Sequence, residues 1–195
     1  AHSAKGFGFI SLIFILMYAL TTLFDFESDI NFAGTWQKLK NKCNLIPANE
    51  VSFVHLSWQG ASAYHLEPAK KIVHDISAQT RSFKVAVSGI GIFTGADPVL
   101  YLNVVKNRAL MALHEVLWDK LSPFAEDFNA YYGPNDWVPH ITLVYGMLLP
   151  EDLCCAVTEL MYEPFSFELT VDNLALIFLS DGSVGIDSRF DLLPV

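Results

Sequence analysis

The sequence is poor in positive charge and in the residues that keep a chain flexible. Its 195 residues include 12 Lys and Arg against 21 Asp and Glu, which gives a formal net charge of −9. Proteins that bind long nucleic acids through many phosphates need an excess of cations, so we expect no extended nucleic-acid surface. Only 11 Gly and 9 Pro occur, while 52% of the residues are hydrophobic. This composition excludes disorder and low-complexity repeats, and the length suits one packed domain or two small lobes.

Cysteine is also scarce, and the common metal-binding and dinucleotide-binding motifs are missing. Cys43 stands alone, whereas Cys154 and Cys155 are adjacent and are expected to share a helix. Because this placement does not suit a disulfide framework, we interpret the cysteines as reduced and predict a cytoplasmic protein. The sequence has no Cys-x-x-Cys pair, no His-Glu-x-x-His run and no Gly-x-Gly-x-x-Gly fingerprint. We therefore expect no metal site and no cofactor.

The N-terminal segment is unusually apolar. From Gly6 to Phe24 there are 19 consecutive residues without a formal charge, close to the roughly 20 of a membrane-spanning helix. Residues 18–24 are rich in strand-forming residues, which favours a buried first strand. We expect residues 1–16 to be an extension upstream of a natural start at Met17; a membrane or export segment and an extra strand are the open alternatives. Residues 17–195 are expected to form a single bilobal domain. A membrane is not an expected partner, although attachment through residues 6–24 stays open.

Hydrophobic periodicity predicts alternating strands and helices along the rest of the chain. The expected strands are 51–58, 83–88, 99–105 and 138–146, followed by 165–171, 173–179 and 184–192, and the expected helices are 28–42, 68–76, 110–121 and 150–161. Residues 122–138 form a long loop, of a kind that is often functional, and Asp181-Gly182 is a tight turn. Several neighbouring strands are linked as hairpins, which favours an antiparallel α+β fold over a doubly wound parallel sheet.

Two predicted strands carry the same short motif. His55-Leu-Ser-Trp58 and His140-Ile-Thr-Leu143 each place an apolar residue, a hydroxyl residue and another apolar residue after a histidine. Side chains at positions i and i+2 of a strand share a face. Each strand therefore presents an imidazole beside a hydroxyl, while the intervening residues enter the core. If the two strands meet, four polar side chains converge on a volume suited to a phosphate group.

Such a site has a direct mechanism for a cyclic phosphodiester. One neutral histidine removes a proton from water or a ribose hydroxyl, while the other, protonated, donates to the departing oxygen. We therefore predict His55 and His140 as the general acid and base. The hydroxyls of Ser57 and Thr142 are predicted to bind the phosphate by donating to its non-bridging oxygens. This chemistry requires no metal.

These residues resemble the pair of His-x-Thr/Ser-x motifs that marks the 2H phosphoesterase superfamily, which includes the bacterial 2'-5' RNA ligase-like proteins and the cyclic nucleotide phosphodiesterases. The resemblance extends from Met17 to Val195, and Pro139 precedes His140 as is usual in that family. It implies a bilobal α+β fold with pseudo-twofold symmetry: two mainly antiparallel sheets with flanking helices around a central cleft. It also implies metal-independent RNA-processing chemistry on 2',3'-cyclic phosphate or 2'-5' phosphodiester ends. One departure is the scarcity of cations near either motif, where Lys84 is the nearest.

Aromatic residues close to the motifs are candidate substrate contacts. Trp58 and Tyr145 extend the motif strands, and Tyr131, Tyr132 and Trp137 lie on the long loop. Their rings can stack on a base or pack within the protein, and both interpretations stay open. The remaining histidines of the domain, which we expect to be structural or solvated, are His65, His74 and His114.

Together these observations predict an enzyme, either a cyclic phosphodiesterase or a 2'-5' RNA ligase-like hydrolase. Its expected partner is a small nucleotide or an RNA end, and the chain is expected to be a monomer. The alternative is a non-catalytic module that binds a phosphorylated nucleotide or RNA end at the same place. The sequence does not distinguish hydrolysis from ligation or assign the acid and the base between the two histidines.

Overall fold

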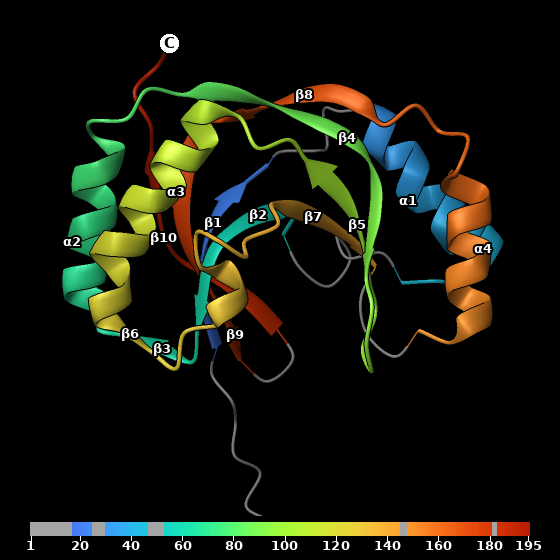
Figure 1. Ribbon diagram of the computed structural model, residues 1–195, viewed down its shortest axis with the longest axis horizontal. Coiled ribbons are helices and arrows are strands. Elements are labelled where there is room, and N and C mark those ends of the chain that lie inside the picture. Colours follow the sequence, from blue (N-terminus) through green and yellow to red (C-terminus); the bar gives the residue numbers. More distant parts are fainter. Residues whose placement is uncertain (1–16, 25–29, 47–52, 145–147, 181–182) are drawn as a thin grey trace, which may run out of the picture.

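The structure is a computed structural model that describes residues 17–24, 30–46, 53–144, 148–180 and 183–195. Strands and helices alternate along these residues (Figure 1). The strands are β1 (Met17–Leu23), β2 (His55–Ala61), β3 (Ala63–Tyr64), β4 (Phe83–Phe93), β5 (Val99–Val104), β6 (Ala125–Glu126), β7 (His140–Val144), β8 (Ser166–Val171), β9 (Asn173–Ser180) and β10 (Ser183–Asp191). The helices are α1 (Ile30–Cys43), α2 (Leu66–Ser77), α3 (Arg108–Leu121) and α4 (Pro150–Leu160), with the short 3-10 helices η2 (Ser122–Phe124) and η3 (Ala130–Tyr132).

Eight of the strands form one antiparallel sheet in the order β10-β9-β1-β2-β7-β5-β4-β8. Four strands lie on each side of the junction between β2 and β7, where Leu56 pairs with Ile141. Figure 1 shows α2 and α3 at one end of the molecule and α1 and α4 at the other. The predicted α+β fold with two halves is confirmed, and the two predicted sheets join at this junction into one.

Helix α3 illustrates why the sequence folds as it does locally. The side chain of Asn107 accepts a hydrogen bond of 2.8 Å from the main-chain N–H of Leu110, which caps the first turn. One face of the helix is buried, and it carries Leu110, Leu113, His114, Leu117 and Leu121. The apolar residues whose spacing predicted this helix therefore form the face that packs against the sheet, where α3 contacts β2.

The expected loop at 122–138 is more ordered than its composition indicates. It contains η2, β6 and η3, and β6 pairs with β3 through Ala63–Glu126 and Tyr64–Ala125. The main-chain N–H of Asn129 donates to the carbonyl of Gly60 at 2.8 Å, which ties the loop to the end of β2. The loop therefore lies over a motif strand.

A disulfide joins the two helices at one end of the molecule. Cys43 of α1 is bonded to Cys155 of α4, whereas Cys154 is free and exposed. Lys38 and Glu163 form an ion pair between the same two regions. The interpretation that all the cysteines are reduced is wrong, because the packing of α1 on α4 brings together residues 112 positions apart. Disulfides persist mainly in oxidising compartments, so the prediction of a cytoplasmic location loses this support and stays a prediction.

Several expectations fall on residues outside the described ranges, namely the extension at 1–16, the helix start at 28–29, the strand start at 51–52 and the turn at 181–182. Strand β1 confirms the first strand predicted at 18–24, including the last part of the uncharged N-terminal run. None of the helices in the described ranges has the length and apolar character that crossing a bilayer requires.

Candidate active site

The junction between β2 and β7 brings the two motifs together. Leu56 pairs with Ile141 across the junction, and both side chains are fully buried. Because side chains alternate along a strand, the residues on either side of this pair lie on the opposite face of the sheet. We call this surface the motif face; it carries the four predicted polar residues His55, Ser57, His140 and Thr142.

In the antiparallel pairing, the histidine of each motif lies opposite the hydroxyl residue of the other motif. When the pairing of Leu56 with Ile141 is extended by one residue in each direction, His55 lies opposite Thr142 and Ser57 lies opposite His140. Opposite residues of antiparallel strands have Cβ atoms about 4.5–5.5 Å apart and diagonal ones about 7–8 Å apart. The two histidines are therefore diagonal neighbours, each facing the hydroxyl residue of the other motif. Their proximity also appears in the pKa of His140, which a charge on His55 lowers.

Both imidazoles are held by the same main-chain contact. Nδ1 of His55 lies 2.6 Å from the carbonyl oxygen of Phe53, and Nδ1 of His140 lies 2.7 Å from that of Val138. A carbonyl accepts, so in both rings the proton is on Nδ1 and Nε2 is the nitrogen left for a substrate. Each ring can accept or deliver a proton at Nε2 while its orientation stays fixed.

The pKa of each motif histidine lies below its ordinary value of 6.5. Burial is the main cause in both, and the hydrogen bonds to Phe53 and Val138 partly oppose it. For His140, a positive charge on His55 lowers the pKa further. Both rings are therefore mainly neutral at pH 7 in the free protein, and protonation of one disfavours protonation of the other.

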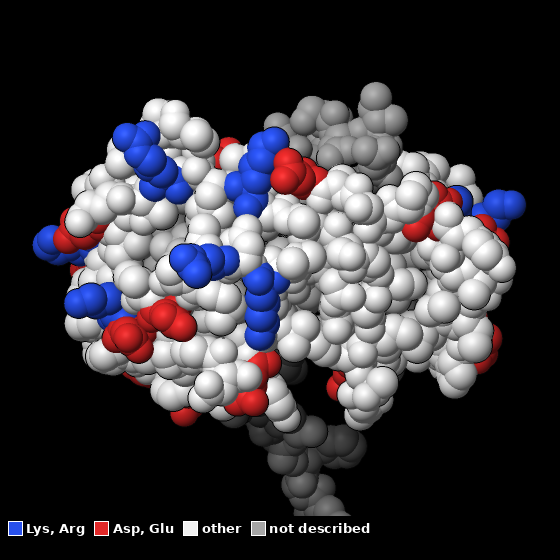
Figure 2. All heavy atoms as spheres, turned by 45° about the horizontal axis from the view of Figure 1, so that its top comes forward, with Lys and Arg blue, Asp and Glu red and all other residues white. Residues whose placement is uncertain are grey.

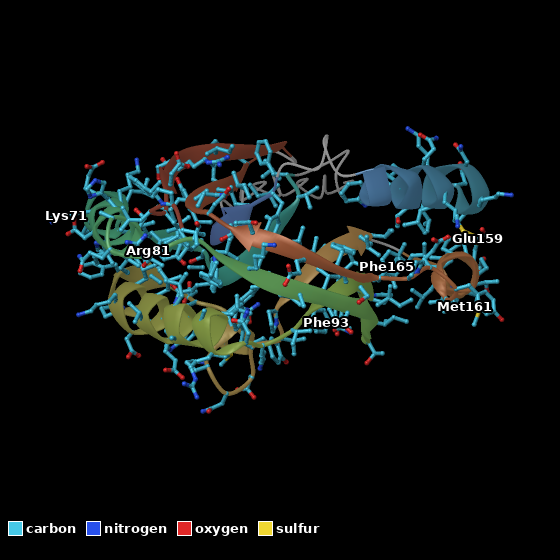
Figure 3. All side chains as sticks on the ribbon, turned by 90° about the horizontal axis from the view of Figure 1, so that it is seen from above. Lys71, Arg81, Phe93, Glu159, Met161 and Phe165 are labelled. Atoms are coloured by element: carbon cyan, nitrogen blue, oxygen red, sulfur yellow. A yellow bond between two sulfur atoms is a disulfide. The ribbon has the colours of Figure 1, made fainter. Side chains whose placement is uncertain are left out.

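Aromatic rings surround His140. The centroid of its ring lies 4.8 Å from that of Phe93 and 5.2 Å from that of Tyr101, each in an edge-to-face arrangement. Phe93 and Tyr101 stack on one another at 4.2 Å. Tyr101 also pairs with Thr142 across β5 and β7, which places it on the motif face. Figure 3 shows Phe93 on β4, between the helix pair α2–α3 and the helix pair α1–α4.

Sequence reasoning missed Phe93 and Tyr101 as site residues. The strand expected at 83–88 ended before Phe93, and the register between β4 and β5 shifts between Val87 and Ile90, so alternation alone could not assign the faces of the two rings. At the close approach of the strands, an added Cβ on Gly91 would lie 2.5 Å from the ring of Tyr101. That Gly91 lies opposite Tyr101 is apparent only from the strand pairing.

Beside the first motif lies Tyr132, which belongs to the loop at 122–138. Ser57 is 7% exposed, and its side chain lies near the phenol of Tyr132. The ring of Tyr132 lies 3.7 Å from where a Cβ of Gly60 would be. Burial raises the pKa of Tyr132, and the polar side chain of Ser57 partly opposes that shift. This residue therefore stays protonated near neutral pH.

The predicted aromatic substrate contacts have different outcomes. Trp58 and Trp137 are 0% and 1% exposed and stack on each other at 5.5 Å. Their indole N–H groups donate to Thr22 Oγ1 and to the carbonyl of Ser57. Of the two open interpretations, burial supports packing within the protein for both tryptophans and not contact with a substrate. The alternation that directs Ser57 to the motif face places Trp58 in the core with Leu56. Tyr131 is 80% exposed, so its ring is open to solvent, and Tyr145 lies outside the described residues.

Charged side chains are not part of the described site. Among the described residues, neither motif histidine forms an ion pair, and no group of three or more His, Cys, Asp and Glu could hold a metal ion. Lys84, the nearest cation in the sequence, pairs with Glu168 at 3.0 Å on the exposed surface of β4 and β8. In Figure 2, Lys and Arg gather over one half of the face shown, and much of the other half is uncharged.

An α+β fold whose two halves each contribute a His-x-Ser/Thr strand to one face of a sheet has the construction of a two-histidine phosphoesterase. The comparison with family models agrees. The chain belongs to the 2'-5' RNA ligase superfamily, whose model matches residues 21–182. A relative from Geobacillus thermodenitrificans (strain NG80-2), named "Putative phosphoesterase", is 29% identical over 132 residues, which cover 67% of this chain and 71% of the relative.

Solved structures share the fold at low sequence identity. TT0787 of Thermus thermophilus superposes with a TM-score of 0.60 at 16% identity, covering 90% of this chain and 97% of that protein. E. coli LigT, solved in complex with 3'-AMP, superposes with a TM-score of 0.58 at 16% identity, covering 92% of this chain and 99% of LigT. The predicted fold and family are confirmed, and family membership supports an activity of the phosphoesterase type.

Proposed function

We propose that this protein is a metal-independent phosphoesterase that acts on a 2',3'-cyclic phosphate or a 2'-5' phosphodiester of a nucleotide or RNA end. The observation that carries the proposal is the crossed arrangement of the motifs, in which two imidazoles, each held through Nδ1, lie diagonally across a single strand pair. The complex of the similarly folded LigT with 3'-AMP supports a nucleotide as the ligand.

In the proposed hydrolysis, the neutral histidine takes a proton from water as the water oxygen attacks phosphorus. The bond from phosphorus to one ribose oxygen of the cyclic phosphate breaks, and that oxygen takes a proton from the protonated histidine. A ribose hydroxyl in place of water would form a phosphodiester by the same proton transfers. Because a charge on His55 lowers the pKa of His140, the two rings take up protons in separate steps, and the one-proton state that this mechanism requires lies between those steps.

The hydroxyl groups would stabilise the phosphate as charge develops. Thr142 and Ser57 lie opposite the two histidines and can donate hydrogen bonds to the non-bridging oxygens. Since the described motif face has no cation, the substrate phosphate is expected to carry a single negative charge, as a cyclic phosphate or a phosphodiester does. The rings of Phe93 and Tyr101 form an apolar boundary at His140.

The test measures turnover of 2',3'-cyclic nucleotides by the full chain in the presence of a chelator. His55→Ala and His140→Ala should each reduce turnover by about a hundredfold or more, because each removes a proton-transfer group. His65→Ala is the matched control, since the side chain of His65 is 64% exposed and pairs with Glu126 at the surface. Full activity in either motif variant would rule out the two-histidine mechanism. Calorimetric binding of the cyclic nucleotide without product over hours would support the non-catalytic alternative instead.

A further inference from the structure

Phe93 and Tyr101 form a pair of stacked rings beside His140. Neither ring belongs to the hydrophobic core clusters of the described residues. Tyr101 is 7% exposed, whereas Phe93 is partly exposed. The two ring centroids lie 4.2 Å apart, with an angle of 29° between the planes. Tyr101 therefore covers one face of Phe93, and the exposure of Phe93 leaves its other face for a further ring.

The strand pairing holds this stack in place. Tyr101 of β5 lies opposite Gly91 of β4, and a Cβ on Gly91 would lie 2.5 Å from the tyrosine ring. The ring of Tyr101 therefore lies across the glycine. Phe93 is two positions further along β4, on the same face as Gly91, and it pairs with Val99. Two paired strands thus position the ring of Phe93.

The surroundings of the two motif histidines differ in exposure. On one side, the residue of β1 that pairs with His55 is Leu23, which is 7% exposed. On the other side, His140 pairs with Asn103 of β5 and contacts Phe93, and both of these residues are partly exposed. Of these neighbours, the ones open to solvent lie on the side of β4 and β5. A ligand bound at the histidines can therefore extend over Phe93.

The distance from Phe93 to the histidine suits a nucleoside. The ring centroids of Phe93 and His140 lie 4.8 Å apart, and the planes are at 87°. In a nucleoside 2',3'-cyclic phosphate, a single ribose separates the base from the phosphate. With the phosphate at Nε2 of His140, a base one sugar ring away can reach the open face of Phe93. Aromatic side chains stack on any base, because every base has a π-face.

We propose that Phe93 is the residue on which the nucleobase of the substrate stacks, so that the protein selects nucleoside cyclic phosphates over cyclic phosphates without a base. The inference rests on the proposed function for the position of the phosphate between the motifs. Phe93 determines specificity and transfers no proton. Tyr101 is the support beneath its ring.

The test compares two probes with the full chain, adenosine 2',3'-cyclic phosphate and methyl riboside 2',3'-cyclic phosphate, which has no base. Phe93→Leu keeps an apolar side chain and removes the ring. We expect it to raise Kd and KM for the adenosine probe about tenfold, with little change in kcat/KM for the probe without a base. Phe93→Tyr retains an aromatic face and should retain the difference between the probes.

The matched control is Phe190→Leu. Phe190 is also partly exposed and meets His74 edge to face, with centroids 5.8 Å apart, but it belongs to β10 at the opposite edge of the sheet. This variant should treat both probes as the wild type does, because it removes a similar ring away from the motifs.

The probe without a base separates stacking from a merely structural role. Equal losses for the two probes in Phe93→Leu would overturn the inference, because Phe93 would then act only by packing on His140. An unchanged Kd for the adenosine probe would overturn it as well. If the wild type turns over both probes equally well, the proposed function holds and the inference fails. If the wild type binds the adenosine probe without turnover and Phe93→Leu weakens that binding alone, the inference holds and the proposed function fails. A wild type that binds neither probe contradicts both.

Discussion

His55 and His140 are held in the same way on neighbouring strands: the Nδ1 atom of each lies 2.6 or 2.7 Å from a main-chain carbonyl two residues earlier. The two rings therefore share one tautomer, and both present Nε2. The hydrogen bonds do not distinguish an acid from a base. What separates the two protonation steps is the repulsion between the rings, because a charge on His55 lowers the pKa of His140. A pair of this kind passes through a state that holds one proton, and that state contains both an acid and a base.

The first prediction concerns the pH dependence of the proposed reaction. Burial lowers the pKa of both histidines below 6.5, so the one-proton state of the free enzyme is most populated below pH 6.5. We expect kcat/KM for a 2',3'-cyclic nucleotide to follow a bell-shaped profile with its maximum on the acidic side of 6.5. The acidic limb reflects loss of the neutral base, and the alkaline limb reflects loss of the protonated acid.

The measurement is kcat/KM across this range at constant ionic strength. The wild type should be compared with His65→Ala, which should keep the same profile because His65 is exposed and belongs to neither motif. A maximum above about pH 7 would contradict the assignment of these histidines as the titrating pair.

The second prediction tests the aromatic rings beside His140. In Gly91→Ala, the new Cβ would lie 2.5 Å from the ring of Tyr101, so that ring must move. Because Tyr101 contacts Phe93 and His140, we expect kcat/KM to fall by about tenfold, with a loss of stability of about 1–3 kcal/mol from overpacking. Gly34→Ala is the control, since nothing lies within 4 Å of its Cβ and alanine favours the helix. An active site unaffected by Gly91→Ala would show that the position of Tyr101 does not matter for turnover.

Much of the fold and the centre of the candidate site could be predicted from local pattern. Helix α3 lies within a few residues of its expected position because it has one buried face with a clear period, and strand β9 does so because it is a short run of mostly buried apolar residues. The placement of His55 and His140 on one face followed from the same alternation. It required only that the two strands be neighbours, and the order of β2 and β7 in the sheet confirms this.

The parts that could not be predicted depend on contacts between distant segments. Trp137 was interpreted as a loop residue that could stack on a base, but its ring packs on His114 and its N–H donates to Ser57, which no local pattern indicates. Phe93 belongs to the site because β4 pairs with β5 after a register shift. The bond between Cys43 and Cys155 depends on how α1 meets α4. In each case tertiary packing decides the environment of a residue whose own segment could be placed from the sequence.

The disulfide provides the third prediction. Its two cysteines are 112 positions apart, so the bond restricts the unfolded chain over a long loop and should stabilise the fold by about 2–4 kcal/mol. Cys43→Ser and Cys155→Ser should each lower the melting temperature by about 5–15 °C in buffer without reductant. Cys154→Ser is the matched control, because Cys154 is free and exposed.

The same experiment has a chemical readout. Alkylation of the denatured wild type before reduction should modify Cys154 and leave Cys43 and Cys155 protected. Reaction of all the cysteines, or equal melting temperatures for the serine variants, would contradict the bond.

The fourth prediction concerns the histidine beneath the loop. Burial lowers the pKa of His114 to about 4, so the folded protein holds this ring neutral while the unfolded chain titrates near 6.5. Between these values the unfolded state binds more protons, and stability must fall as the pH falls. The contribution is present in full above pH 6.5, is lost progressively toward pH 4, and amounts to about 3 kcal/mol.

Replacing His114 by an apolar ring removes this titration. His114→Phe should therefore show a flatter dependence of unfolding free energy on pH than the wild type. At neutral pH it should be less stable by about 1 kcal/mol, because the carbonyl of Tyr132 loses its donor. Urea unfolding on both sides of this range, with exposed His65→Gln as control, measures both effects. Parallel pH curves for wild type and His114→Phe would mean that the buried ring is not the group that titrates.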